Sequence, residues 1–242
     1  MPQAMSPWPA RMDLLQSLSG LLLVLFIWSH MFFESSILLG EDAMYQVSRM
    51  FEGEPFFGKP YPLIVSGVGI TIFVLVAVHA ILALRKFPGN SRQYRLLHQH
   101  MGAIRHPDTT LWYAQVATGF CLFFLIPAHL YTVITQPENI GPYASSDRVW
   151  SERFWIVYAL LLLTVHAHAA IGMYRLFMKW YAPSGVNAKQ TRARMKVAMW
   201  CILVFFTVLG SASLLTYMRI GYQHTDSVGE RYKPATVQDK GH

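Results

Sequence analysis

Residues 154–178 read FWIVYALLLLTVHAHAAIGMYRLFM, an apolar run with two histidines, His166 and His168, near its middle. A helix rises about 1.5 Å per residue, so about 20 apolar residues cross a hydrocarbon core about 30 Å thick. This run is long enough to do so, and four more runs along the chain share its length and character. The sequence therefore predicts an all-α integral membrane bundle of five transmembrane helices, at residues 14–39, 63–84, 111–135, 154–178 and 197–218.

The composition of the 242-residue chain excludes a soluble domain. Hydrophobic residues make up 53% and charged residues only 14%, whereas soluble domains carry about 25% charged residues. The net charge of +7 would suggest a nucleic-acid partner in a soluble protein, but here we expect it to reflect membrane topology. Cys121 and Cys201 lie in apolar runs without a CxxC spacing, so we expect packing roles rather than a disulfide or a thiolate metal site.

Lys and Arg residues are divided unevenly between the two sets of loops. Twelve of the 20 fall in the N-terminal segment and in the loops before the third and fifth spans, where the acids are Asp13 and Asp108. Cytoplasmic loops are enriched in Lys and Arg, so we expect a cytoplasmic N-terminus, a periplasmic C-terminus and a location in the bacterial inner membrane. Residues 1–222 are expected to form the transmembrane domain, and residues 223–242 a polar, weakly ordered tail.

Four histidines within the spans sort into two levels. Measured from the expected cytoplasmic boundary of each helix, His79 and His168 lie roughly 9 and 10 Å inside, and His30 and His129 roughly 24 and 27 Å. Each pair joins two helices at one level, as bis-imidazole ligation of a haem in a bundle core requires. The alternative is that each histidine only hydrogen-bonds a neighbouring helix. Because intramembrane histidine is costly and usually functional, we interpret the pairs as ligands of two haems.

Three glycines and one further histidine are also expected near these two levels. Gly20, Gly69 and Gly119 each precede a candidate ligand by ten residues, so each should lie at the depth of the other haem, where a missing side chain admits a porphyrin. His166 points about 200° away from His168 around the helix and cannot ligate the same iron. It is expected to be either a hydrogen-bonded polar group or part of a proton route.

Two acids are candidates for proton handling on the outer side. Residues 41–59 carry apolar side chains at helical spacing, which predicts a short amphipathic segment along the outer interface. Within it, Glu52 could accept protons from a quinol while electrons leave for the outer haem, although a solvated loop acid is the alternative interpretation. Glu34 lies one helical turn beyond His30 and is the second candidate.

Five strings are the most specific local patterns in the chain. They are HMFF at 30–33, HA at 79–80 with RKFP at 85–88, DTTLW at 108–112, HLY at 129–131 with TQP at 135–137, and GMYRL at 172–176. Together they resemble the di-haem cytochrome b membrane-anchor subunit of menaquinol:fumarate reductase, a member of the succinate:quinone oxidoreductase superfamily. The resemblance extends from about Met12 to Tyr222.

The resemblance implies the same ligand pairs and makes Glu52 the carboxylate near the site of menaquinol oxidation. It implies a location near the haem propionates for five further residues, Gln16, Ser17, Trp112, Arg148 and Lys179. His166 stands where well-known relatives carry a glutamate proposed to return protons across the membrane. The implied cofactors are two haem b groups, with menaquinol as substrate. FAD and iron–sulfur clusters would belong to a flavoprotein and an iron–sulfur subunit on the cytoplasmic face, in a heterotrimer that can associate into a dimer.

Three functions are compatible with these patterns. The leading hypothesis is an electron-transfer subunit that oxidises menaquinol near the outer haem and passes electrons through both haems to partner subunits that reduce fumarate. The chain has no nucleotide-binding loop or nucleophile elbow of its own, and its basic loops suit docking of an electron-transfer partner. The alternatives are the cytochrome b subunit of a membrane-bound hydrogenase or formate dehydrogenase, and a non-catalytic membrane scaffold whose histidines only stabilise packing.

Overall fold

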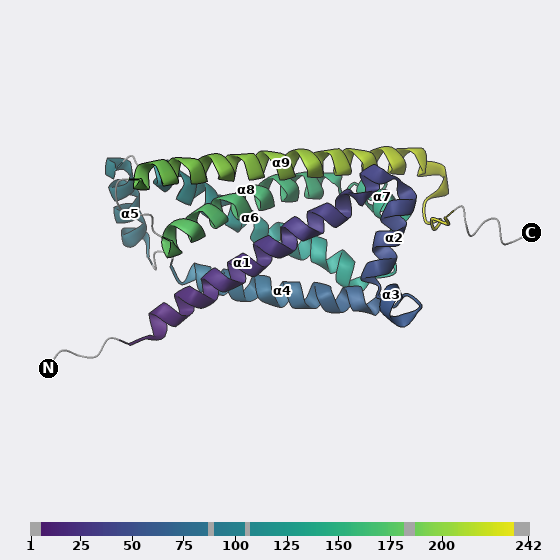
Figure 1. Ribbon diagram of the computed structural model, residues 1–242, viewed down its shortest axis with the longest axis horizontal. Coiled ribbons are helices and arrows are strands. Elements are labelled where there is room, and N and C mark those ends of the chain that lie inside the picture. The colour runs from purple at the N-terminus through teal and green to yellow at the C-terminus, as the bar shows by residue number, and fades with distance from the viewer. Residues whose placement is uncertain (1–5, 87–89, 105–106, 182–186, 235–242) are drawn as a thin grey trace, which may run out of the picture.

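The computed structural model describes residues 6–86, 90–104, 107–181 and 187–234, and every regular element within them is helical (Figure 1). Five helices are long and apolar enough to cross a membrane, which confirms the predicted fold class. They are α1 (Trp8–Glu34, continued by the 3-10 helix η1, Ser35–Leu39), α4 (Leu63–Leu84), α6 (Pro107–Thr135), α8 (Trp155–Trp180) and α9 (Ala188–Gln223). The first and last helices extend beyond the expected spans, because their polar ends continue the helix outside the apolar core of each run.

Four of the long helices form a ring, and the fifth packs outside it. Around the ring α1 packs on α4, α4 on α6, α6 on α8, and α8 on α1, whereas the diagonal pairs α1 with α6 and α4 with α8 scarcely touch. Helix α9 lies against α8 and also contacts α1 (Figure 1). The interior of the ring is therefore bounded by α1, α4, α6 and α8.

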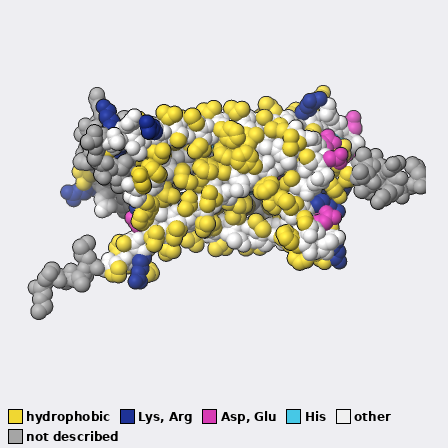
Figure 2. All heavy atoms as spheres, viewed as in Figure 1, with side chains coloured by type: hydrophobic (Ala, Val, Ile, Leu, Met, Phe, Trp, Pro, Cys, Tyr) yellow, Lys and Arg dark blue, Asp and Glu magenta, His cyan; other side chains and the backbone are white. Residues whose placement is uncertain are grey.

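The face of the bundle shown in Figure 2 is apolar over its middle and carries charged side chains at its two ends. Large side chains such as Phe120, Leu163 and Val208 are more than half exposed, which suits contact with lipid acyl chains. Cys121 and Cys201 are also exposed on this surface, so the prediction that they are packing residues is wrong. An apolar run marks membrane depth but does not say which of its side chains face neighbouring helices.

One end of the bundle, here called the basic end, is tied together by two acidic residues. Asp13 on α1 accepts contacts from Arg85 at 2.7 Å, Lys86 at 3.0 Å and Lys179 at 3.2 Å. These contacts link α1 to the end of α4 and to α8. At the same end, Asp108 contacts Arg192, Lys196 and Tyr174, and helix α5 (Ser91–Ile104) precedes α6. Asp13 and Asp108 are the two acids that the sequence places among the cations of these loops. Each of them therefore joins three of the long helices.

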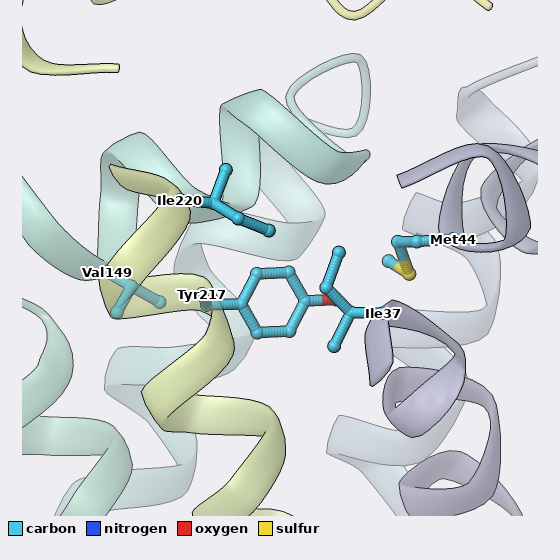
Figure 3. Packing of buried hydrophobic residues seen from close by; sticks show 5 residues of the cluster. All are labelled: Ile37, Met44, Val149, Tyr217 and Ile220. Carbon is cyan, nitrogen blue, oxygen red and sulfur yellow. The ribbon is translucent and has the colours of Figure 1, made fainter. Parts of the chain in front are cut away.

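The opposite end, here called the strap end, carries the short helices and the C-terminal segment. The short helices are α2 (Glu41–Phe51), α3 (Glu54–Phe57), α7 (Pro142–Trp150) and the 3-10 helix η2 (Thr225–Ser227). Their core is a cluster in which the ring of Tyr217 from α9 lies between Ile37 and Ile220 (Figure 3), with Met44 and Val149 completing it. The predicted amphipathic segment is thus formed by α2 and α3, and Met44 is the residue of that segment that anchors it to the bundle.

The C-terminal segment from residue 224 to 234, here called the strap, is held closely against this end. Asp147 of α7 accepts hydrogen bonds from His224 Nδ1 at 2.9 Å and from the backbone N–H of Gly229 at 3.0 Å. The hydroxyl of Tyr232 donates to Asp42 of α2 at 2.7 Å. The described part of the tail is therefore fixed by specific contacts, in contrast to the weakly ordered tail that its polar composition suggested. The expectation for residues 235–242 lies outside the described residues.

Candidate functional site

Each helix of the four-helix ring contributes one candidate histidine ligand, and the structure brings these histidines together in two pairs. Towards the basic end, His79 of α4 faces His168 of α8, with ring centres 6.5 Å apart. Towards the strap end, His30 of α1 faces His129 of α6, with ring centres 6.3 Å apart. Both pairs join diagonal partners across the ring, so each pair spans its interior.

The hydrogen bonds of the basic-end pair leave the same nitrogen free on both rings. His168 Nδ1 lies 2.9 Å from the backbone carbonyl of Gln115, an acceptor, so this nitrogen carries the proton. His79 Nδ1 lies 3.1 Å from Ser19 Oγ, whose own proton is directed to the carbonyl of Gln16. Ser19 must then accept from His79. Both rings are thereby held in the tautomer whose Nε2 lone pair can bind a metal.

The strap-end pair is oriented mainly by aromatic packing. The ring of His30 stacks on Phe26 with centres 5.7 Å apart, and Tyr158 of α8 meets the ring of His129 edge-on at 5.5 Å. His129 Nδ1 is buried and has no hydrogen-bond partner within the described residues. A buried, unsatisfied nitrogen is costly without a ligand, so this ring is a second candidate for metal binding.

The spacing of the rings fits a cofactor that is held from both faces. A metal-bound imidazole nitrogen lies about 2.0–2.1 Å from the metal and roughly 1 Å from its ring centre, so two imidazoles on opposite sides of one ion have ring centres about 6 Å apart. Both observed separations agree with this value. No group of three or more His, Cys, Asp or Glu able to hold a metal occurs among the described residues. Two protein ligands per metal suit a macrocycle that provides the rest, and these residues therefore fit haem.

Each of the three glycines predicted near the haem levels lies against a bulky side chain. A Cβ on Gly20 would lie 2.9 Å from Cε1 of His79, and a Cβ on Gly119 equally close to Cε1 of His168. Both glycines lie at the level of the basic-end pair, as their depth predicted, and each leaves room there for a ligand ring. Gly69 makes room for Ile134 of α6, whose Cγ1 would lie 2.8 Å from an added Cβ. The position of a glycine along its helix sets its depth in the bundle. The rotation of the helix about its axis decides which neighbouring side chain the glycine lies against.

Replacing Gly119 with alanine is expected to displace the ring of His168 and to weaken cofactor binding at the basic-end pair. Overpacking of this kind costs about 1–3 kcal/mol. The measurement is haem content and thermal stability of the purified complex. Gly67→Ala is the matched control, because Gly67 is also helical but has no atom within 4 Å of an added Cβ. Equal haem content in the two variants would contradict the role assigned to Gly119.

The five residues expected near propionates are distributed over both ends. Three of them gather at the basic end, where Lys179 Nζ lies 3.4 Å from Ser17 Oγ and where Gln16 carries a buried Oε1 without a partner among the described residues. Trp112 is on the same end of α6 and packs on its neighbour Tyr113. Arg148 lies at the strap end on α7.

Arg148 is an unusual residue at the strap end because it is a buried cation. It is only 6% exposed, and its Nη2 donates to the carbonyl of Asn139 at 2.8 Å. Its Nε is buried without a partner in the described part of the chain. A buried guanidinium with an unused donor is suited to bind a carboxylate, which fits the expected propionate contact.

Glu34 and His166 occupy different parts of the strap-end half. Glu34 Oε2 accepts a hydrogen bond of 3.0 Å from the hydroxyl of Tyr217, which is buried. His166 is 1% exposed, and its ring stacks on Phe206 of α9 at 5.5 Å. Neither of its nitrogens has a hydrogen-bond partner among the described residues, so His166 faces α9 and is separate from the ligand pairs. No described residue hydrogen-bonds this ring, and its part in a proton route stays a prediction.

Glu52 is the more buried of the two acids that are candidate proton acceptors. It is 4% exposed at the end of α2, which argues against the solvated loop acid that was its alternative interpretation. Its Oε2 lies 3.0 Å from Arg49 Nη1. Its backbone carbonyl accepts a hydrogen bond from Tyr61 just before α4, so the position of this carboxylate is fixed at both its side chain and its backbone.

The sequence did not identify several residues that contact the candidate histidines or Glu52. A repeated Ser/Thr-Gly pair points to two of them. Ser19 and Thr118 both contact a basic-end histidine, and each is followed by one of the two glycines that face the same ring. The same Ser/Thr-Gly pair therefore occurs on α1 and on α6, eleven residues before the strap-end ligand of that helix. Arg49 and Tyr158 have no comparable signal, because their contacts depend on how helices pack.

Comparisons with known proteins give a consistent set of matches. A family model described as the succinate dehydrogenase/fumarate reductase transmembrane subunit matches residues 91–210. The fumarate reductase cytochrome b subunit of Helicobacter pylori is 43% identical over 218 residues, covering 90% of this chain and 84% of that protein. The same subunit of Wolinella succinogenes is 43% identical over 221 residues, covering 91% and 86%. The succinate dehydrogenase hydrophobic membrane anchor subunit of Archaeoglobus fulgidus is 28% identical over 102 residues, or 40% of this chain.

Proposed function

This chain belongs to the family of fumarate reductase cytochrome b subunits, which are membrane anchors within an oxidoreductase complex, and we propose that it oxidises menaquinol and passes the electrons to partner subunits that reduce fumarate. Two haem b groups held by this chain would supply the electron transfer across the bundle. The observation that carries this proposal is the presence of two histidine pairs, each set across a diagonal of the helix ring at the spacing of two axial ligands.

Within this proposal the chain's own residues bind and orient the cofactors. His79 and His168 would ligate the basic-end haem through Nε2, while Ser19 and the carbonyl of Gln115 hold the two rings in the required tautomer. His30 and His129 ligate the strap-end haem. Bound haem supplies one-electron transfer, and its potential depends on axial ligands, nearby hydrogen bonds and burial.

The cations and amides near each site serve the propionates in this proposal. Gln16, Ser17, Lys179 and Trp112 would hold those of the basic-end haem, and Arg148 those of the strap-end haem. Support comes from the unused Nε of the buried Arg148. Charge-assisted contacts with a carboxylate also reduce the cost of burying a cation such as Arg148.

Glu52 is the proton acceptor for menaquinol in this proposal. Oxidation of the quinol releases two electrons and two protons, and a buried carboxylate held by Arg49 can take up a proton from the quinol hydroxyl. Its position at the strap end, on the amphipathic helix α2, gives a lipid-soluble quinol lateral access from the bilayer. Glu34 and His166 are further proton-handling candidates, since Glu34 is hydrogen-bonded to Tyr217 and neutral histidine can relay a proton.

The partners follow from the family and from the charge of the two ends. We propose that the basic end faces the cytoplasm of a bacterial cell, where Lys and Arg accumulate. There it docks the iron–sulfur subunit, which passes electrons to the flavoprotein with its FAD. The strap end then faces the periplasm, and two such heterotrimers can associate into a dimer.

The test is to purify the complex and to measure its subunits, its haem content and its activity together. We expect copurification with a flavoprotein and an iron–sulfur protein, two haems per chain and menaquinol-dependent fumarate reduction in proteoliposomes. A complex with an outward-facing hydrogenase or formate dehydrogenase would favour the related alternative. One haem or none per chain would contradict the ligand assignment, and full activity without haem would favour the scaffold.

A further inference from the structure

We propose that Arg49 and Glu54 join Glu52 to form an exit route through which protons taken from the quinol leave the protein at the strap end. This inference rests on the proposed role of Glu52 as the proton acceptor. It adds two residues that do not touch the quinol: a cation that positions two carboxylates, and a second carboxylate that passes the proton to water.

The geometry of this exit route is that of one guanidinium group shared by two acids. Arg49 Nη1 lies 3.0 Å from Glu52 Oε2, and Arg49 Nε lies 3.4 Å from Glu54 Oε2. The first contact is a hydrogen bond. The second is an ion pair only, because Nε has no aligned hydrogen-bond partner in the described residues. Glu52 is therefore held firmly, whereas Glu54 is attracted but free to reorient.

The exposure of the three side chains increases in the direction in which a proton would leave. The side chain of Glu52 is 6% exposed, that of Arg49 33% and that of Glu54 41%. Glu54 also lines a surface pocket of about 230 Å³, together with Tyr45, Arg49 and Pro55. A proton that reaches Glu54 thus has direct access to solvent, whereas a proton on Glu52 does not.

The turn between α2 and α3 is what brings both acids to the same cation. Gly53 stands between Glu52 and Glu54 and has a φ of +81°, a left-handed conformation that residues with a side chain rarely adopt. An added Cβ would lie 2.7 Å from Cδ1 of Ile64 on α4. The glycine therefore reverses the chain against α4, so that Glu52 turns inwards while Glu54 stays at the surface beside Arg49.

The charge of Arg49 remains in place throughout this transfer. Burial lowers the pKa of Arg49, but its hydrogen bond to Glu52 and the neighbouring Tyr45 and Glu54 raise that pKa overall. Arg49 therefore does not carry the proton itself. Its charge attracts both carboxylates and so holds them close together between turnovers.

The steps balance in protons and charge. A quinol hydroxyl transfers its proton to the Glu52 carboxylate, while the electron leaves through the haem of the proposed function. The neutral Glu52 then passes the proton to the Glu54 carboxylate and is ionised again beside Arg49. Glu54 releases the proton to water at the strap end, and the second proton of the quinol follows the same route.

The test uses Glu54→Gln in the intact complex, with menaquinol oxidation measured in detergent and in proteoliposomes. We expect kcat to fall about tenfold with KM for quinol unchanged, a smaller loss than the roughly 10²–10⁴-fold typical of a general base that contacts the reacting proton. Imidazole buffer is expected to restore kcat of Glu54→Gln in a concentration-dependent way, because a small diffusible base can collect the proton from Glu52. A residue that only stabilises the turn would not respond to imidazole.

Four further variants separate this inference from the proposed function. Glu138→Gln, an exposed acid of the same end, is expected to retain full activity. Arg49→Lys should retain more activity than Arg49→Gln, since lysine keeps the charge beside both acids. If Glu52→Gln is inactive but Glu54→Gln equals Glu138→Gln, the exit route is wrong and the role of Glu52 stands. If Glu52→Gln is fully active, the proposed quinol site itself is wrong.

Discussion

Replacing His129 with alanine is expected to reduce the haem content of the complex from two haems per chain to one. The strap-end site would lose one of the two histidines proposed to hold its haem, whereas the basic-end pair, His79 and His168, lies on the other diagonal of the ring and keeps its hydrogen bonds to Ser19 and Gln115. Electron transfer from menaquinol to fumarate should then stop, because the path across the bundle is interrupted. The measurement is the dithionite-reduced absorption spectrum together with haem quantified per chain.

The same truncation at His166 is the control for this result. His166 is also a buried histidine, but it faces Phe206 of α9 rather than another histidine. His166→Ala creates a cavity of the same size and should retain both haems, whatever its effect on turnover. Loss of a haem in His166→Ala together with two haems in His129→Ala would overturn the pairing.

Replacing Glu52 with glutamine is expected to lower menaquinol oxidation by roughly 10²–10⁴-fold, the usual contribution of a general base. Glutamine has nearly the same size and can still bind Arg49 through its carbonyl oxygen, so the turn should stay intact, but it cannot accept a proton. Both haems should remain in the complex. Fumarate reduction with a water-soluble artificial donor that reacts with the partner subunits should also be unchanged.

Comparing menaquinol oxidation with fumarate reduction from the artificial donor distinguishes loss of the proton acceptor from a general loss of stability. A general loss of stability would lower both activities and the haem content together, whereas removal of the proton acceptor lowers only the quinol-dependent rate. Glu138→Gln serves as the control for loss of a negative charge at the strap end. Quinol oxidation at the normal rate in Glu52→Gln would falsify the assignment of this residue.

Much of the fold could be predicted because a bilayer simplifies the problem. A transmembrane helix must have about 20 apolar residues, so its position in the chain can be read directly. The predicted second span, 63–84, coincides with α4, and the others differ from the observed helices at their polar ends. The roles of Cys121 and Cys201 were predicted wrongly, since lipid and protein neighbours both favour apolar side chains.

The candidate site was only partly accessible from the sequence. The levels of His30, His79, His129 and His168 follow from the helical rise alone. Their supporting contacts do not, because contacts such as Ser19 with His79 depend on the rotation of two helices about their own axes. Arg49 was overlooked for the same kind of reason, since the left-handed turn at Gly53 brings two acids to it.

The sequence by itself determined the number of helices, the two levels of histidines and the division of charge between the ends, because each of these depends on distance along one helix or on simple counts. Only the tertiary structure decided that ligand pairs lie on the diagonals of a four-helix ring, that α9 stays outside it, and that Glu52 shares Arg49 with Glu54. These features depend on which helices are neighbours and on how each helix is rotated about its own axis. In a uniformly apolar run, many such arrangements bury similar surfaces, and close packing of particular side chains selects one of them.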